Sequence, residues 1–270
     1  MKLRLNAAIG GTLVGTVITM ALMSLVWTPF DPLKLNLRMR LKPPTDLHWL
    51  GTDEFGRDIL SRLIAGAGAS LLVAALTVVL ALLLGTLFGL VAGYFRGRTD
   101  RLMMVVNDAL LAFPGILLAL GIMVVTGANK YGIVLALGLA YTPTVVRLVR
   151  GTVLSLREKE FVEASRVIGN SELTTMLRHI LPNCLAPITV LATSMFGWAI
   201  LSESALSFLG LGVPPPAPTW GNMLASSRSF IAQAVWLGIF PGLCISLTLL
   251  GINLLGDAVR DRLDPRMRGV

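Results

Sequence analysis

The chain has 270 residues, of which 54% are hydrophobic and only 14% charged, with a formal net charge of +8. Soluble domains carry roughly 25% charged residues, so water is not the solvent for most of this chain. Nucleic acid is not an expected partner, because the basic residues do not form a patch with stacking aromatics on a soluble surface.

The apolar residues occur in long blocks that predict transmembrane helices. Segments at about 7–27, 70–95 and 235–256 contain no charged residue, and each exceeds the ~20 residues that cross a bilayer core as a helix. Three further blocks, at about 102–126, 131–146 and 183–211, are nearly as apolar. The sequence therefore predicts an all-α membrane protein with six spans. The first apolar run is too long for a signal peptide and no cleavage site follows it, so we expect it to remain as an anchor.

Positive charge predicts the orientation of these spans. With the N-terminus inside, most of the 23 Lys and Arg residues fall in the inner segments, which favours both termini in the cytoplasm of a plasma (inner) membrane protein in contact with lipid. Six basic residues in the first outer loop weaken this signal: Lys34, Arg38, Arg40, Lys42, Arg57 and Arg62. The expected organisation is an N-terminal anchor and outer loop (1–69), a core of transmembrane helices (70–256) and a C-terminal tail (257–270).

The outer loop begins with prolines, which favour an extended path, and then becomes amphipathic. The pattern from Asp53 to Leu63 predicts a helix lying at the membrane interface that leads into the second span. Trp49 and Trp220 are expected as amphipathic anchors at the outer interface. His48 beside Trp49 is a poor metal cage by itself, and we expect neither a metal site nor a cofactor.

Three features inside the spans have alternative interpretations. Gly85, Gly89 and Gly93 at four-residue spacing let two helix backbones approach closely, and they serve either packing within the chain or subunit pairing. Asp108 and Glu203 are ionisable groups at membrane depth, which should face protein or water. We expect a structural role for Asp108. For Glu203, lining of the transport pathway and structural hydrogen bonding both remain open.

A polar stretch at 157–182 lies between the fourth and fifth spans and predicts two short helices that form an elbow. In the first helix, one face carries Phe161, Ala164, Ser165 and Ile168. Gly169 is suited to end this helix with positive φ, and Asn170 or Ser171 can cap the second helix, which is expected to run to Ile180 before Pro182.

The elbow resembles the EAA loop of binding-protein-dependent ABC importer permeases. The match consists of Glu163-Ala164-Ser165, then Gly169, then Leu181-Pro182, with Ser165 where alanine is usual and His179 where isoleucine is common. The resemblance implies the type I ABC importer permease fold. It also implies that this loop is a coupling helix docking on the ATPase subunit, a role that Glu163, Ala164 and Gly169 inherit by position.

Other segments resemble the C-type permease of dipeptide, oligopeptide and nickel importers. They are His48-Trp49-Leu50-Gly51-Thr52-Asp53, Gly56-Arg57-Asp58, Ser202 to Gly212, Asn253-Leu254-Leu255-Gly256-Asp257 and Asp264-Pro265. The resemblance implies three kinds of partner: a homologous B-type permease, two ATP-binding subunits, and a periplasmic or lipoprotein solute-binding protein. Short peptides are the first expected substrate and nickel or a nickel chelate the second, with glutathione-like and opine substrates also open.

Two other classes of protein are weighed against this interpretation. The chain contains no G-x-x-x-x-G-K-[ST] phosphate loop, so it needs a separate ATP-hydrolysing partner, and it offers no nucleophile and base for an intramembrane enzyme. An ion-gradient-driven secondary transporter is the stronger rival. However, the chain offers such a transporter only Asp108 and Glu203 as intramembrane charges. The secondary-transporter interpretation also leaves the elbow unexplained.

Overall fold

The computed structural model describes residues 2–263, which form helices joined by loops. Within these residues the only β pairing is an isolated bridge between Thr52 and Asp58, and the expected all-α fold is confirmed. The elements are α1 (Lys2–Met23), the short η1 (Leu37–Met39), α2 (Ile59–Phe95), α3 (Gly97–Leu111), α4 (Gly115–Thr126), α5 (Lys130–Leu156), α6 (Glu160–Val167), α7 (Glu172–Thr174), the π-helical η2 (Thr175–Ile180), α8 (Leu181–Phe208), α9 (Trp220–Ser227) and α10 (Trp236–Leu263). The predicted Asp264-Pro265 motif and the end of the tail lie outside the described residues.

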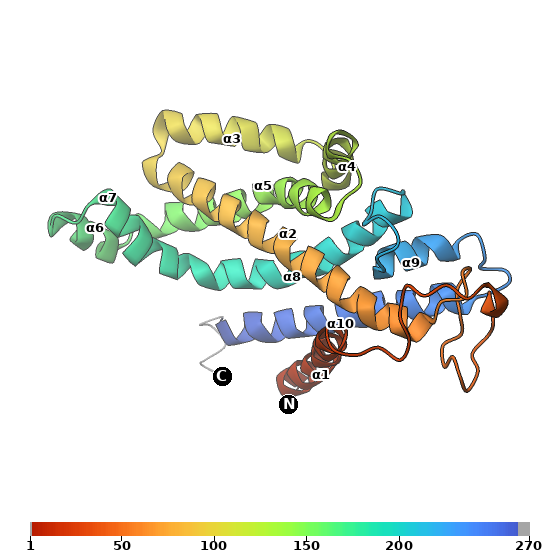
Figure 1. Ribbon diagram of the computed structural model, residues 1–270. Helices are drawn as coiled ribbons and strands as arrows, with labels where there is room; N and C mark the ends of the chain where they lie inside the picture. Colours follow the sequence, from red (N-terminus) through yellow and green to blue (C-terminus); the bar gives the residue numbers. More distant parts are fainter. Residues whose placement is uncertain (1, 264–270) are drawn as a thin grey trace.

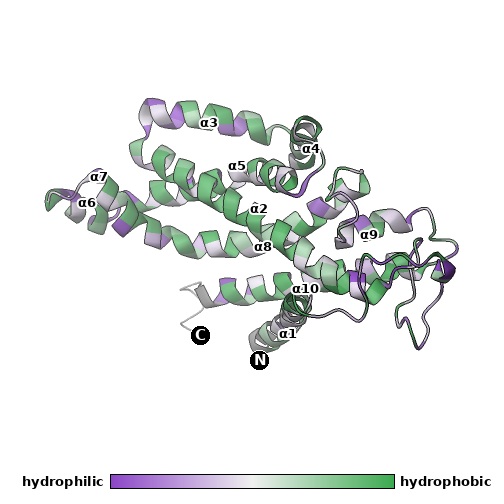
Figure 2. Cartoon of the chain, in the orientation of Figure 1, coloured by the Kyte–Doolittle hydropathy of each residue, from purple (hydrophilic) through white to green (hydrophobic). Residues whose placement is uncertain are grey.

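The long helices define the body of the protein and separate two polar ends. Helices α2, α5, α8 and α10 form this body, with the elbow of α6 and α7 projecting at one end and the 28–58 loop and α9 at the other (Figure 1). Hydrophobic residues dominate the long helices, whereas hydrophilic residues gather in the elbow and in the 28–58 loop (Figure 2). This distribution suits a protein that crosses a bilayer with a polar end on each side.

Five helical stretches of the described chain are long and apolar enough to cross a membrane, and a sixth crossing is broken. The five are Leu5–Met23, Ile59–Phe95, Lys130–Leu156, Glu172–Phe208 and Trp236–Asp261. The span predicted over 102–126 is a bent pair of helices, because α3 and α4 meet there at 89°. Pro114 disfavours helical geometry in the residue before it, and it stands at the N-cap of α4 with ψ 127°. Counted as one span, this bent pair completes the predicted six.

Helix α2 packs on α5 along a row of glycines. A Cβ added at Gly85, Gly89 or Gly93 would lie 2.3, 2.7 or 2.8 Å from the Cβ of the facing valine, which is Val145, Val149 or Val153 respectively. The glycines therefore serve close helix packing within the chain, the first of the two alternatives. Gly11 and Gly15 differ, since an added Cβ there meets nothing within 4 Å.

The glycine row predicts an overpacking penalty at Gly85. We expect Gly85→Ala to lower the free energy of unfolding by about 1–3 kcal/mol, because the methyl group forces α2 and α5 apart. The measurement is the melting temperature of the purified protein in detergent. Gly121→Ala in α4 is the matched control, because its added Cβ meets nothing within 4 Å. Equal melting temperatures for the two variants would contradict the packing assignment.

The start of α2 differs from the expected interfacial helix over 53–63. The helix begins at Ile59, with the Asp58 side chain accepting a hydrogen bond from the Ser61 backbone as the N-cap, and it runs without a break to Phe95. Ser61 and Arg62, expected on a water-facing side, are buried. The 28–58 loop folds over this first turn and supplies partners, including the Pro32 carbonyl, which accepts from Arg62 at 3.1 Å.

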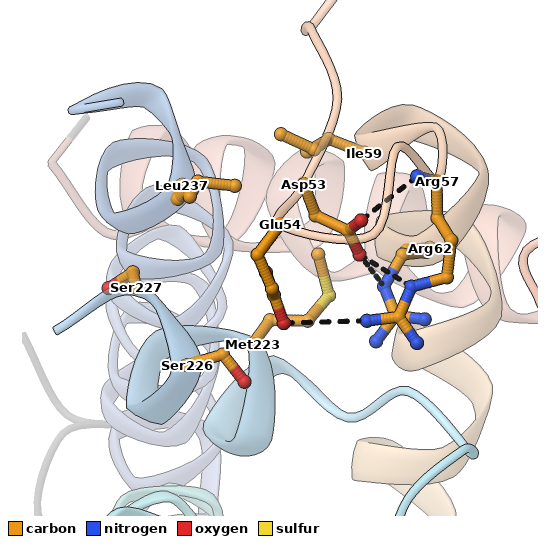
Figure 3. Close-up of a pocket in the computed structure, with 9 residues that line it drawn as sticks. All are labelled: Asp53, Glu54, Arg57, Ile59, Arg62, Met223, Ser226, Ser227 and Leu237. Atoms are coloured by element: carbon orange, nitrogen blue, oxygen red, sulfur yellow. Dashed lines mark hydrogen bonds and ion pairs between the residues drawn. The ribbon is translucent and has the colours of Figure 1, made fainter. Parts of the chain in front are cut away.

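A buried ion-pair cluster holds the 28–58 loop on α2 (Figure 3). The Asp53 carboxylate accepts from Arg57 Nε at 2.6 Å and lies 3.4 Å from Arg62 Nε, and Glu54 lies 3.5 Å from Arg57. Burial raises the pKa of the Glu54 carboxyl, against the lowering effect of its backbone hydrogen bond. The His48 ring pairs with Asp58 at 2.9 Å, so this histidine has a structural partner at the N-cap of α2.

The two tryptophans expected at the outer interface behave differently. Trp49 is 70% exposed, as an interfacial anchor requires. The prediction for Trp220 is wrong, since it is fully buried at the start of α9. Its indole Nε1 donates to the Leu63 carbonyl at 3.0 Å and its backbone N–H donates to Ser70 Oγ at 3.1 Å. Trp220 thus fastens α9 to the N-terminal part of α2.

Candidate functional site

The elbow is formed by two arms joined at a tight turn. Helix α6 begins after Lys159, with Glu160 and Glu163 in its first turn, where the helix dipole favours acidic side chains. Gly169 follows with φ +88°, as predicted for the residue that ends this helix. Ser171 caps α7, its side chain accepting from the Thr174 backbone, which selects Ser171 over Asn170.

The second arm does not end at Pro182 as expected. Helix α7 passes through the π-helical turn η2 directly into α8, and Pro182 occupies the first turn of α8. A proline is tolerated near a helix start because its missing N–H has no role there. Asn183 Nδ2 also donates to the His179 carbonyl at 2.7 Å, which satisfies an acceptor in this turn. The second arm of the elbow is therefore continuous with the fifth span.

Ser165 lies on the inner side of the elbow, which corrects the predicted face of α6. It is only 3% exposed, and its hydroxyl lies 3.0 Å from Thr175 Oγ1 and accepts from Asn170 Nδ2 at 3.1 Å. Val162 is fully buried beside it. A hydroxyl in place of the usual alanine thus joins the two arms. Ser165 therefore stabilises the elbow from inside and is not part of its exposed surface.

The outward side of α6 and the turn form one exposed surface, which we name the elbow tip. Val167 and Ile168 are 82% and 79% exposed, unusually high for apolar side chains without a partner. Sequence reasoning missed Val167, although its spacing of three from Ala164 places the two on one side of a helix. The elbow tip consists of Phe161, Glu163, Ala164, Val167, Ile168 and Gly169, all exposed.

The base of the elbow is tied to the end of α2 by charged and aromatic contacts that sequence reasoning also missed. Arg96 donates to Glu158 at 2.7 Å, and Arg157 Nη1 donates to the Tyr94 carbonyl at 2.5 Å. The Tyr94 ring lies 5.8 Å from the guanidinium carbon of Arg157 and 5.3 Å from that of Arg166. The sequence signal that could have predicted these contacts is the position of Arg157 at the start of the elbow, shortly before α6.

Helix α5 extends to Leu156, ten residues beyond the predicted end of the fourth span at 146. Two ion pairs to α3 accompany this extension. Arg150 donates twice to the Asp100 carboxylate at 2.5 and 2.7 Å, and Arg147 donates to Asp108 at 2.9 Å. The contact of Asp108 is thus the structural one that the sequence favoured.

Glu203 lies between α8 and α9, and it is 1% exposed. One carboxylate oxygen accepts from Ser207 at 2.8 Å and from Thr219 at 3.0 Å. The other oxygen has no hydrogen-bond partner among the described residues. These contacts favour the structural alternative for Glu203, because they fasten the segment leading into α9 to the fifth span.

A groove of about 850 Å³ lies on one side of the helix bundle, away from Glu203. It is open along its length and mostly apolar, with basic side chains from α5 and α10. The lining residues are Leu111, Thr144, Arg147, Leu148, Ala186, Pro187, Val190, Leu191, Ser194 and Arg260.

Comparison with solved structures supports the fold. The chain is similar to one of the inward-facing methionine ABC transporter MetNI, with a TM-score of 0.62 and 16% identity over 75% of this chain and 96% of that chain. Residues 85–269 match the family described as the binding-protein-dependent transport system inner membrane component, and the chain belongs to this family. Its members are inner-membrane permease components of ABC importers, which use separate ATP-binding and solute-binding partners and have no ATPase site of their own.

Curated relatives align with nearly the whole chain. The dipeptide transport system permease of Alkalihalophilus pseudofirmus is 44% identical over 97% of this chain and 86% of its own length. The di/tripeptide permease of Pseudomonas aeruginosa is 44% identical over 97% of this chain and 89% of its own length. The glutathione transport system permease of Pectobacterium atrosepticum is 40% identical over 97% of this chain and 87% of its own length.

Proposed function

We propose that this chain is the C-type permease subunit of an importer for short peptides, in which the elbow tip docks on an ATP-binding subunit. The observation that carries this proposal is the exposed elbow tip, which projects from one end of the bundle (Figure 1) and turns at Gly169. The relatives named for dipeptides, di/tripeptides and glutathione share a substrate class with peptide bonds. This favours peptides over nickel.

The elbow and both termini face the cytoplasm in this proposal, and the 28–58 loop faces outward. The support is the charge distribution, since most Lys and Arg residues lie in segments on the elbow side of the expected spans. Outward, the 28–58 loop would help receive the solute-binding protein or the partner permease. A homologous B-type permease pairs with this chain, and the groove beside α5 and α8 lines their shared pathway.

Transport proceeds by alternating access. Closure of two ATP-binding subunits moves the docked elbow tips and reorients the long helices around the pathway. The apolar side chains of Val167 and Ile168 fill a cleft of the ATP-binding subunit. Glu163 forms an ion pair with a basic residue at the rim of that cleft. Among the described residues Glu163 forms no ion pair, so it is available to a partner.

The docking surface predicts the effect of a charge at its apolar centre. We expect Ile168→Glu to reduce the amount of ATP-binding subunit that co-purifies with the chain about tenfold, because docking would bury an unpaired carboxylate. Ile168 is exposed, so folding should be unaffected. Leu177→Glu is the matched control, since Leu177 is 50% exposed on the other arm. Equal recovery in both variants would exclude docking through the elbow tip.

The substrate class is tested with the assembled transporter in proteoliposomes. The complex contains this chain, its B-type partner, the ATP-binding subunits and the solute-binding protein. We expect ATP-dependent uptake of a labelled dipeptide and no uptake of nickel ion. Nickel uptake without peptide uptake would show that the substrate is nickel rather than a peptide. Uptake driven by an ion gradient without ATP would show that the protein is a secondary transporter rather than an ABC importer.

A further inference from the structure

The Tyr94 side chain lies between the elbow and the body of the protein. It lies in the last turn of α2 and is 4% exposed. The guanidinium carbons of Arg157 and Arg166 lie 5.8 and 5.3 Å from its ring centroid. These two arginines come from different elements, because Arg157 is the C-cap of α5 and Arg166 belongs to α6. One ring therefore contacts both the base of the elbow and its projecting arm.

Arg157 is held by its hydrogen bond to the Tyr94 carbonyl as well as by the ring, whereas the contact of Arg166 with Tyr94 is with the ring alone. A guanidinium within about 6 Å of a tyrosine centroid is held by the ring quadrupole, and the described residues include no ion pair for Arg166 or Arg157. The Tyr94 hydroxyl makes no hydrogen bond with the described residues. The ring, rather than the hydroxyl, is thus the part of Tyr94 that holds Arg166.

Helix α2 carries this contact toward the other face of the membrane. Its 37 residues correspond to a rod of roughly 55 Å at 1.5 Å per residue, longer than the ~30 Å hydrocarbon core. Beside Tyr94, Gly93 is in close contact with Val153 of α5. A displacement of α6 that pulls Arg166 therefore acts on the end of a continuous helix whose other end lies under the 28–58 loop.

We propose that Tyr94 is a positioning residue that transmits movement of the docked elbow to α2 through Arg166. This inference rests on the proposed function, because it requires an ATP-binding subunit to move the elbow tip. Docking uses the outward side of α6, whereas transmission uses the contact at its base. The two steps are therefore separable by substitution.

The test compares Tyr94→Leu, Tyr94→Phe and Arg166→Gln in the assembled complex reconstituted with its solute-binding protein. Tyr94→Leu keeps an apolar side chain but removes the ring, so we expect the ATP hydrolysed per peptide transported to rise about fivefold with subunit recovery unchanged. Tyr94→Phe keeps the ring and should behave as the unmodified chain. Arg166→Gln, a change of an exposed residue, should reproduce the effect of Tyr94→Leu.

Several outcomes would overturn this proposal. Unchanged coupling in Tyr94→Leu would remove the role of the ring, and equal defects in Tyr94→Leu and Tyr94→Phe would assign the effect to the hydroxyl. Loss of the ATP-binding subunits in Tyr94→Leu would make the residue a mere support of the elbow. The proposed function fails by a different readout, namely retention of those subunits in Ile168→Glu.

Discussion

Replacing Gly169 with valine should abolish uptake while leaving the chain inserted in the membrane. At φ +88° a β-branched residue is strained by about 1–3 kcal/mol, and the turn can relieve this strain by adopting another conformation. A Cβ added at this position itself meets nothing within 4 Å. The substitution should therefore change the orientation of the elbow tip and leave the rest of the fold intact. We expect the ATP-binding subunits to dissociate during purification.

The measurement is peptide uptake by cells that express the whole transporter, together with subunit recovery in mild detergent. Gly169→Asn is the conservative variant, because asparagine tolerates positive φ better than other non-glycine residues, and it should retain most uptake. Gly151→Val is a second control, since an added Cβ at this helical glycine also meets nothing within 4 Å. Normal uptake by Gly169→Val would refute the coupling role of the turn.

The Asp53→Asn substitution should release the 28–58 loop from the outer end of α2. Arg57 and Arg62 both depend on the Asp53 carboxylate (Figure 3), and removal of one partner of a buried pair costs about 3–5 kcal/mol. We expect faster trypsin cleavage of the purified protein at the exposed basic residues of the loop that no proline follows, which are Lys34, Arg38 and Arg40.

The matched control for this release is Asp46→Asn. Asp46 lies in the same loop but is exposed and has no ion pair among the described residues, so its neutral variant should be cleaved at the original rate. Equal cleavage of the two variants would show that the buried cluster does not hold the loop in place.

Local patterns in the sequence predicted the features of the elbow that depend on few residues. Gly169 and Ser171 take the conformations that their chemistry favours, and length and hydropathy located the spans. Ser165 was misplaced because a helical face drawn from apolar and small residues does not show which side the second arm covers. Its partner Thr175 lies ten positions away, beyond the range of helical periodicity.

The outer end of the protein was less predictable for a related reason. Asp58, Ser61 and Arg62 have the spacing of a water-facing stripe, and only the folded loop above them turns this stripe into a buried cluster. Trp220 was assigned to the interface because tryptophan is common there, yet its partners Leu63 and Ser70 come from a helix some 150 positions earlier in the chain. Such contacts depend on tertiary packing.

The register of α2 on α5 also determines how the chain is threaded through the membrane. The pairs Gly85 with Val145, Gly89 with Val149 and Gly93 with Val153 increase together, so these two helices run in the same direction. Parallel neighbours require the intervening segment to return to the starting face, and the bent pair of α3 and α4 is the segment that does so. Six crossings are an even number, and we therefore expect both ends of the chain on a single side of the bilayer.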